Sequence, residues 1–530
     1  MSNPGMSDKF FHTQARPWQN SIDPLLPDQG NKQQFAVDET GTKATSHPRP
    51  IAMNPNGTQA HFTTDFSVNQ KPAKPKVRGR FSDSRRKEVQ EVRKRGACIR
   101  CRMLKKPCSG DNPCNTCQNV ESARLWKQPC IRTRIAEEFN LYSAGLHAVL
   151  AFHAVSQAKG QVRLEQTPGR IEATHYPDSG IVATFTPLKC KALAHADIDP
   201  AIFAAIFASQ LEVIDSEDDA TGKLDLYVKQ IVPSFFESED SSFMKSTIDT
   251  ACGTNSTNKD GLLTKVLELW ILTRILTSPA LKWHLFSNPS LAPTMAPSTI
   301  TPSDLENTSR TPITSANNQA SYSLIKTQLM SATEKRAACL SRTVMNDLER
   351  RLLQRQQANP FETFLVAVIL LACVERMCWL FRTWEDQNEL STPIADSTHA
   401  HPSQHTTDDN LAQALRSAPS NDLDHSQQNR KWLKWPFDKQ PAYYSQQGER
   451  FSDILFMLLK MRGVPPKPQP RSTDGMLVMW GDDIDDRVRG WYEGINITNE
   501  LLAEKRDAQF VGEDPKEWEL KHVGKIISGL

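Results

Sequence analysis

Apolar residues recur at helical spacing in several stretches of the C-terminal part of the chain. Residues 360–384 are apolar on nearly every face, which predicts a core helix that begins near Pro360. Periodic apolar positions also predict helices at 261–277, 323–356 and 449–466. No alternation of strands with helices stands out, so we expect a helical, mainly all-α region over 185–530.

Polar and proline-rich stretches interrupt this pattern. Residues 1–70 mix Gln, Asn, Pro, Thr and Gly without apolar periodicity, which predicts a disordered N-terminal segment. Two further stretches, 287–320 and 390–430, are rich in Ser, Thr, Pro, Asn and His, and we expect disordered inserts there. Residues 71–96 form a basic unit, in which a proline-interrupted arm precedes a short helix at 83–96.

A weaker apolar stripe follows the cysteine-rich segment. It occupies every third or fourth position from Ile135 to His153, and it predicts an amphipathic helix or linker over 132–160. The stripe lasts fewer than three heptads and contains Gly145, so packing on the chain's own domain is favoured over a coiled coil. A homodimer formed through a heptad-like helix at 135–153 stays the alternative.

The chain carries no segment that predicts secretion or a membrane span. Its start lacks a basic and apolar leader, and the longest strongly apolar run, 364–374, is about half of the ~20 residues that a spanning helix needs. We therefore expect a soluble intracellular protein with no membrane partner. In a reducing compartment, clustered cysteines bind metal more often than they form disulfides.

Charge is distributed unevenly along the chain. The net charge is +2, yet residues 71–135 hold 19 Lys or Arg against 5 Asp or Glu, a local balance of +14. The remainder must then sum to −12. A basic segment of this kind is the electrostatic footprint of a polyanion partner such as DNA.

Six of the eleven cysteines fall inside this basic segment. They follow the spacing C-x2-C-x6-C-x5-C-x2-C-x12-C, and they are Cys98, Cys101, Cys108, Cys114, Cys117 and Cys130. Two C-x-x-C pairs in close succession are a strong signal for zinc. Two ions need eight ligand positions, and six thiolates fill them only if two sulfurs bridge both metals. The sequence therefore predicts a binuclear zinc cluster over 97–131 with two Zn²⁺ per chain, whose folding depends on the metal.

The module resembles the zinc binuclear-cluster DNA-binding domain of fungal transcription factors. The resemblance rests on the C-x-x-C pairs, on Arg102, Lys105 and Lys106 before the third cysteine, and on the proline loop at Pro113. It implies that Cys98 and Cys114 bridge the ions, with Cys101 and Cys108 completing one site and Cys117 and Cys130 the other. It also implies that Lys105 reads guanines of a CGG-like half-site in the major groove.

Two departures from the family pattern affect these expectations. Leu104 and Pro107 stand where the family often has basic residues, so we expect DNA contacts to spread to neighbouring cations. We expect DNA contacts from Lys105, Lys106, Arg102, Arg100, Arg93, Lys94, Arg95, Arg132 and Arg134. The last gap, of twelve residues, exceeds the family's usual length. Either its loop bulges with Trp126 packed back on the cluster, which we favour, or Cys130 is not a ligand.

The resulting hypothesis is a nuclear, zinc-dependent, sequence-specific regulator of RNA polymerase II transcription. The resemblance implies control of a metabolic or secondary-metabolite gene set, and the helical region would meet the transcription machinery or a co-regulator. A zinc-stabilised protein–protein or chromatin adaptor without DNA reading is the alternative. We expect no enzyme, because the acidic run 481–486 lacks neighbouring ligands and is typical of a solvated helix start. Four further cysteines are expected to be buried core thiols: Cys252, Cys339, Cys373 and Cys378.

Overall fold

The structure is a computed structural model of the 530-residue chain. It describes residues 82–118, 130–190, 211–255, 261–301, 304, 309–391, 435–464, 466–510, 512 and 514–528. The predictions of a disordered segment at 1–70 and of the basic arm before the first helix lie outside the described residues. The same holds for the loop that contains Trp126 and for nearly all of the predicted insert at 390–430.

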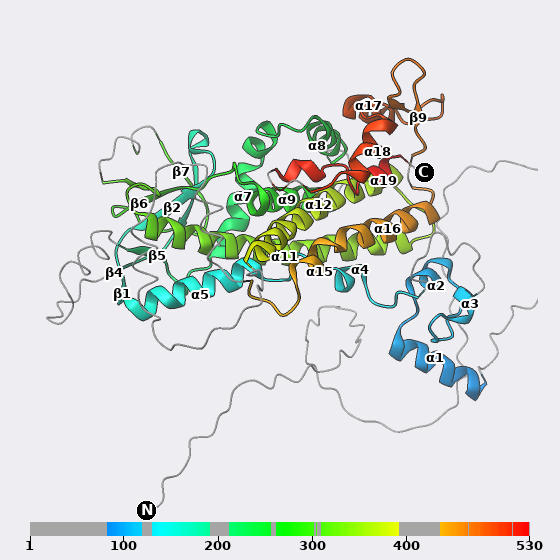
Figure 1. Ribbon diagram of the computed structural model, residues 1–530, viewed down its shortest axis with the longest axis horizontal. Coiled ribbons are helices and arrows are strands. Elements are labelled where there is room, and N and C mark those ends of the chain that lie inside the picture. Colours follow the sequence, from blue (N-terminus) through cyan, green and yellow to red (C-terminus); the bar gives the residue numbers. More distant parts are fainter. Residues whose placement is uncertain are drawn as a thin grey trace, which may run out of the picture. The chain divides into compact units, whose positions relative to one another are not determined.

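Helices form most of the body, and the predicted ones are confirmed in existence and type. The helices that match the predictions are α9 (Leu262–Thr277), α11 (Gln319–Leu353), α12 (Pro360–Ser391) and α16 (Gln447–Met461). Around them lie α7 (Ala220–Glu237), α8 (Ser242–Asn255), α15 (Pro441–Ser445), α17 (Asp486–Ile495), α18 (Asn499–Asp507) and α19 (Gly524–Ile527), with short 3-10 turns η2 (Pro177–Ser179) and η3 (Pro515–Trp518). In Figure 1, α11, α12 and α16 lie side by side, and α9 packs on both α11 and α12.

Helix α12 lies at the centre of this body. Its segment Pro360–Glu385 is long and apolar enough to cross a membrane, with a mean hydropathy of 2.2 over its most apolar window, but that window is entirely buried inside the protein. Neighbours on several sides, among them α9, α15 and α16, cover it. An all-round apolar helix is expected to be enclosed in this way, which confirms the predicted core helix.

Small antiparallel sheets accompany the helices, so the body is mostly helical, as expected, but it is not purely all-α. A five-stranded sheet has the order β7-β3-β2-β6-β8, a three-stranded sheet the order β1-β4-β5, and β9 pairs with β10. The strands are β1 (Leu164–Gln166), β2 (Arg170–Thr174), β3 (Ile181–Phe185), β4 (Pro187–Cys190), β5 (Glu212–Ile214), β6 (His284–Asn288), β7 (Ser298–Thr299), β8 (Thr311–Ile313), β9 (Gln469–Pro470) and β10 (Leu477–Val478). The stretch 287–320, expected to be disordered, contains β7, β8 and the first residues of α11.

Charged residues inside the five-stranded sheet explain why its pattern was missed. All five residues of β2 are buried, and Glu172 at its centre faces Phe286 on β6. Its carboxylate accepts from Arg170 at 2.8 Å and from Arg310 at 2.7 Å. A buried charge is tolerated when it is paired and hydrogen-bonded in this way. The strand alternates polar and apolar residues over only five positions, and its polar residues are buried as well, so no apolar run marks it in the sequence.

The predicted helix at 135–153 is broken in two. Helix α4 (Ile135–Glu138) ends at Phe139, whose backbone is extended, and α5 (Leu146–Gln161) begins after Gly145, its N-cap, which has a left-handed φ of 77°. Phe139 packs edge-on against Phe451 of α16 with ring centroids 4.7 Å apart, and the Tyr142 hydroxyl contacts Thr273 of α9 at 2.7 Å. The first part of the stripe therefore packs on the chain's own core, and the continuous heptad-like helix proposed for a homodimer is wrong.

Candidate metal centre and nucleic-acid interface

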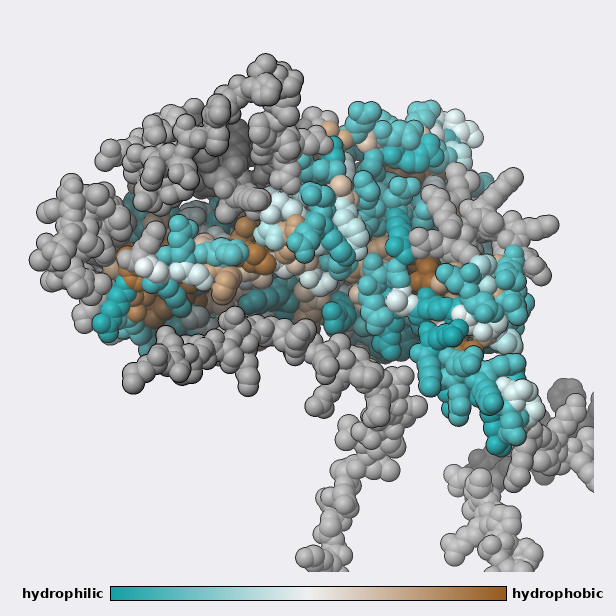
Figure 2. All heavy atoms as spheres, turned by 60° about the horizontal axis from the view of Figure 1, so that its bottom comes forward, coloured by the Kyte–Doolittle hydropathy of each residue, from teal (hydrophilic) through white to brown (hydrophobic). Residues whose placement is uncertain are grey.

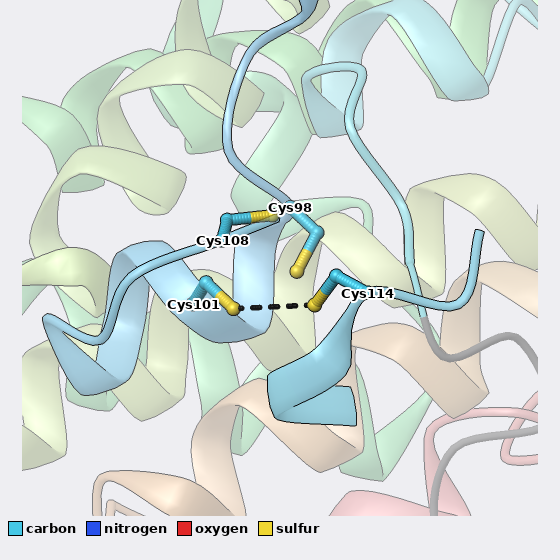
Figure 3. A group of neighbouring side chains, drawn as sticks. All are labelled: Cys98, Cys101, Cys108 and Cys114. Atoms are coloured by element: carbon cyan, nitrogen blue, oxygen red, sulfur yellow. Dashed lines mark hydrogen bonds between the residues drawn. The ribbon is translucent and has the colours of Figure 1, made fainter. Parts of the chain in front are cut away.

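Each C-x-x-C pair lies at the start of a short helix. Cys98 precedes α2 (Ile99–Leu104) and Cys101 lies within it, while Cys114 precedes α3 (Asn115–Gln118) and Cys117 lies within it. Residues three apart share one face of a helix, so the two thiols of each pair point the same way. Figure 3 shows Cys98 and Cys101 facing Cys114 across the centre, with Cys108 arriving from the loop between the helices.

The six thiols form two overlapping groups of four that share Cys98 and Cys114. The groups are Cys98, Cys101, Cys108 and Cys114, and Cys98, Cys114, Cys117 and Cys130, with all sulfur atoms of a group within 4.8 Å of one another. The Cys101 and Cys114 sulfurs are 3.6 Å apart, and those of Cys98 and Cys117 are 3.8 Å apart. A tetrahedral Zn²⁺ with Zn–S bonds of ~2.3 Å places its sulfurs about 3.8 Å apart, so the donor set fits zinc.

Cys130 joins the second group despite the long gap before it. Its sulfur accepts the Cys114 backbone N–H at 3.1 Å, and Ile131, next in the chain, accepts the Ile99 backbone N–H at 2.8 Å. These contacts hold the segment that begins at Cys130 against α2 and α3. The loop 119–129, which would have to bulge, lies outside the described residues.

Two arginines, Arg100 and Arg132, place positive charge beside the cysteine thiols. Burial raises the pKa of Cys101 to about 12 and that of Cys130 to about 11. Burial also acts on Cys108, but hydrogen bonds, including one from Arg132 at 3.4 Å, bring its pKa below the ordinary value. Arg100, which donates to Cys117 at 3.6 Å, lowers the pKa of that thiol in the same way. Positive neighbours favour thiolates, which are the form that binds metal.

The basic residues predicted to contact DNA fall into two groups. Six of them are exposed: Arg93, Lys94, Arg95, Lys105, Lys106 and Arg134. The first three form the last turn of α1 (Asp83–Arg95), which has no buried residue and packs on the cysteine cluster through Val92. Lys105 caps the end of α2 in a left-handed conformation, with φ of 53°. The end of the molecule that carries α1 is hydrophilic on the face shown at lower right in Figure 2.

The other three predicted DNA contacts are half-buried and hydrogen-bonded inside the protein. Besides Cys117, Arg100 donates to the Thr116 carbonyl at 2.9 Å. Arg132 donates to the Gly96 carbonyl at 3.0 Å, which links the end of α1 to the segment after Cys130. Arg102 pairs with a carboxylate of the helical body instead of facing solvent. Arg100 and Arg132 therefore hold the module together, whereas Arg102 links it to the helical body.

Helix α2 also packs on the body. Ile99 and Met103, one turn apart, are buried in the main apolar core rather than in the cysteine cluster. The partner of Arg102 is Glu349 near the end of α11, with Nη1 and Oε1 2.8 Å apart, and Arg462 after α16 donates to the Met103 carbonyl at 3.0 Å. Sequence reasoning missed Glu349 and Arg462 because they lie more than 240 residues from their partners and belong to no motif.

Other candidate residues have simpler positions. The acidic run 481–486 leads into α17, where Asp485 caps the helix by accepting the Arg487 N–H, as expected for a helix start. Cys373 and Cys378 are buried as predicted, but Cys252 and Cys339 are exposed, so that prediction is wrong for these two. They sit on the outer faces of α8 and α11, where the helix periodicity turns toward solvent.

Comparison with known proteins indicates the class of transcription factors. Residues 204–418 match the family model of the KpeA transcription factor, a region that includes most of the helical body. The cysteine cluster at 98–130 is consistent with a zinc-binding motif. The matches are to fungal transcription factors, in agreement with the expectation that the chain is not an enzyme.

Two particular relatives illustrate this class. A stretch of 100 residues is 38% identical to transcription factor kpeA of Aspergillus oryzae, covering 18% of this chain and 13% of that protein. A stretch of 101 residues is 33% identical to the satratoxin biosynthesis SC3 cluster transcription factor SAT20 of Stachybotrys chartarum, covering 18% of this chain and 14% of that protein. The matched stretches thus span only a small part of each relative. No solved structure matches the chain.

Proposed function

We propose that the chain is a nuclear, zinc-dependent regulator of RNA polymerase II transcription that binds DNA in a sequence-specific way. The observation that carries this proposal is the pair of four-thiol groups sharing Cys98 and Cys114, set within the most basic segment of the chain. The similarity to fungal transcription factors supports the same function. A module used only for protein contact has no need of a local charge of +14.

In this proposal the six cysteines bind two Zn²⁺ ions. Cys98 and Cys114 would be shared by both ions, Cys101 and Cys108 would complete one set of ligands, and Cys117 and Cys130 would complete the other. Two ions and six thiolates sum to −2, and the guanidiniums of Arg100 and Arg132, which donate to cysteine sulfurs, offset that charge. When bound, the metal supplies most of the folding free energy of a module this small.

DNA reading is assigned to the exposed cations at the end of α2. Lys105 and Lys106 have free reach to solvent there, and an ammonium suits the paired O6 and N7 acceptors of guanine in a CGG-like half-site. The last turn of α1 and Arg134 would contact phosphates, since they are exposed and flank the module on the same basic segment, α1 before it and Arg134 after it. Arg100 and Arg132 would act indirectly, by fixing the module's shape.

The target genes are proposed from a relative. The name of the Stachybotrys protein refers to a biosynthesis cluster, and we infer that this chain likewise regulates a secondary-metabolite gene set. The helical body, which the family model matches in large part, would receive the signal or contact a co-regulator.

Binding-site selection from a random duplex pool tests the proposal with the full-length chain. We expect an enriched G-rich motif that disappears when a chelator removes zinc, and affinity that falls steeply with salt. The variant Lys105→Gln should relax base preference at one position, while Lys439→Gln, a control far along the chain, should bind as the wild type does. A chain that enriches no motif with zinc present would refute DNA reading and favour the adaptor alternative.

A further inference from the structure

Helix α2 has two occupied faces. One presents Cys101 to the metal centre, and the other buries Ile99 and Met103 against the helical body. The helix has only six residues. Its carbonyl at Met103 also accepts from Arg462, whose guanidinium donates in addition to Leu353 of α11 at 3.1 Å. The helix assigned to DNA reading is therefore docked on the ends of α11 and α16.

Arg102 is the charged element of this contact. Its Nη1 donates to Glu349 at 2.8 Å, its Nη2 donates to the Thr133 carbonyl at 3.4 Å, and its Nε is buried without a partner among the described residues. The Glu349 side chain is 6% exposed, and its second oxygen accepts the Ile135 backbone N–H at 2.8 Å. One carboxylate thus holds both α2 and the start of α4.

We propose that Glu349 is an intramolecular competitor of the DNA backbone for Arg102. The inference rests on the proposed function. A carboxylate and a phosphate bind a guanidinium through the same charge-assisted hydrogen bonds. Glu349 neutralises the Arg102 guanidinium and occupies one of its donors, so a phosphate would have to compete with this carboxylate for the side chain. The buried Nε, which has no partner in the docked state, would find one in the open state.

This competition couples the helical body to DNA binding. Anything that shifts the end of α11 away from α2 would release Arg102 and raise DNA affinity. By linkage, bound DNA would weaken the docking of α2 by the same factor. The body would therefore regulate the module through one ion pair and the apolar contact beneath it.

The variant Glu349→Gln tests the competition in the full-length, zinc-loaded chain, with the selected duplex as the probe. Glutamine keeps an acceptor for the Ile135 N–H but removes the charge that holds Arg102. We expect DNA affinity to rise roughly fivefold or more, the lower end of typical allosteric couplings. The salt dependence should steepen by about 0.9, the contribution of one added phosphate contact. In an Arg102→Gln background, Glu349→Gln should have no effect.

The matched control is Asp347→Asn, on the same helix. It also removes a negative charge, but Asp347 pairs with Lys265 of α9 and with Arg350 of its own helix, and no ion pair joins it to the described part of the module. Should Glu349→Gln lose its fold or its zinc, Glu349→Met offers an apolar side chain of similar length for the buried position. An affinity equal to that of the control, or below that of the wild type, would overturn the competition. A wild-type chain without zinc-dependent duplex binding would overturn the proposed function and the inference with it.

Discussion

The substitution Cys130→Ser should remove one of the two zinc ions that we propose. In the structure, the group of four that contains Cys101 and Cys108 does not include Cys130, so its ion keeps all four thiolates. The other group would retain only Cys98, Cys114 and Cys117. A site with three protein ligands and an open fourth position no longer has the closed geometry of a structural zinc site.

The expected magnitude follows from this ligand count. Wild-type chain should carry two zincs, and the Cys130→Ser chain one. Apparent binding free energies of structural zinc are about 10–16 kcal/mol in small zinc domains, so losing the second ion should also lower the melting temperature of the module. The control is Cys339→Ser, because that thiol is exposed on α11 and lies outside both groups.

Metal content measured by mass spectrometry on desalted, full-length protein checks this prediction. Spectroscopy with Co²⁺ in place of zinc would report the number of thiolates around each ion. If the Cys130→Ser chain still holds two zincs, the assignment of Cys130 is wrong, and the long loop before it does not close the cluster. If Cys339→Ser loses zinc as well, the loss reflects general unfolding rather than a missing ligand.

Three further predictions concern side chains around the cluster and in the body. Arg132→Gln should weaken both zinc retention and DNA binding, because Arg132 donates to Cys108 and to the Gly96 carbonyl, whereas exposed Arg134→Gln should weaken DNA binding alone; zinc content and duplex affinity of the two variants separate these effects. Burial raises the pKa of Glu375 to about 8 from an ordinary 4.5, so the unfolding free energy should fall as pH rises through that window, by at most on the order of 5 kcal/mol, and melting curves of Glu375→Gln should show a smaller fall. Gly448→Ala should lower the free energy of unfolding by about 1–3 kcal/mol in denaturant titrations. The added Cβ would lie 2.6 Å from the His522 ring and 2.9 Å from the Cys378 sulfur, and this overlap should outweigh the ~1 kcal/mol that alanine gains in helix propensity.

The sequence predicted the helices well where apolar periodicity was sustained. The expected helix at 261–277 became α9 almost residue for residue, because nearly every side chain of that stretch is enclosed. The broken stripe after the cysteines was harder to predict. The stripe has the right spacing, but the backbone leaves the helix at Phe139 and re-enters one only after Gly145, and apolar spacing alone does not report backbone conformation.

Contacts between distant segments were beyond the sequence. The strand β2 contains a charged residue, Glu172, and yet is buried. The fold tolerates this charge because Arg310, 138 residues later in the chain, pairs with it. Likewise, Arg102 was expected to contact DNA from its place in the motif, and only the fold brings Glu349 to it. Motif spacing predicted which thiols gather, because those ligands are local, but not which cations near them are already paired.

Helix α12 has a consequence for how the chain is synthesised. Part of its cover comes from segments made later, including η3, which begins about 130 residues after Glu385 (515 minus 385). At roughly 5–20 residues per second, ribosomes need about 6 to 26 s to add them. During that interval a strongly apolar helix is left partly uncovered, so we expect nascent chains to depend on chaperones that bind such segments. After α15, α16 and η3 have been synthesised and packed, Glu375 of α12 accepts the backbone N–H groups of His522 and Val523. These hydrogen bonds hold the C-terminal segment against α12.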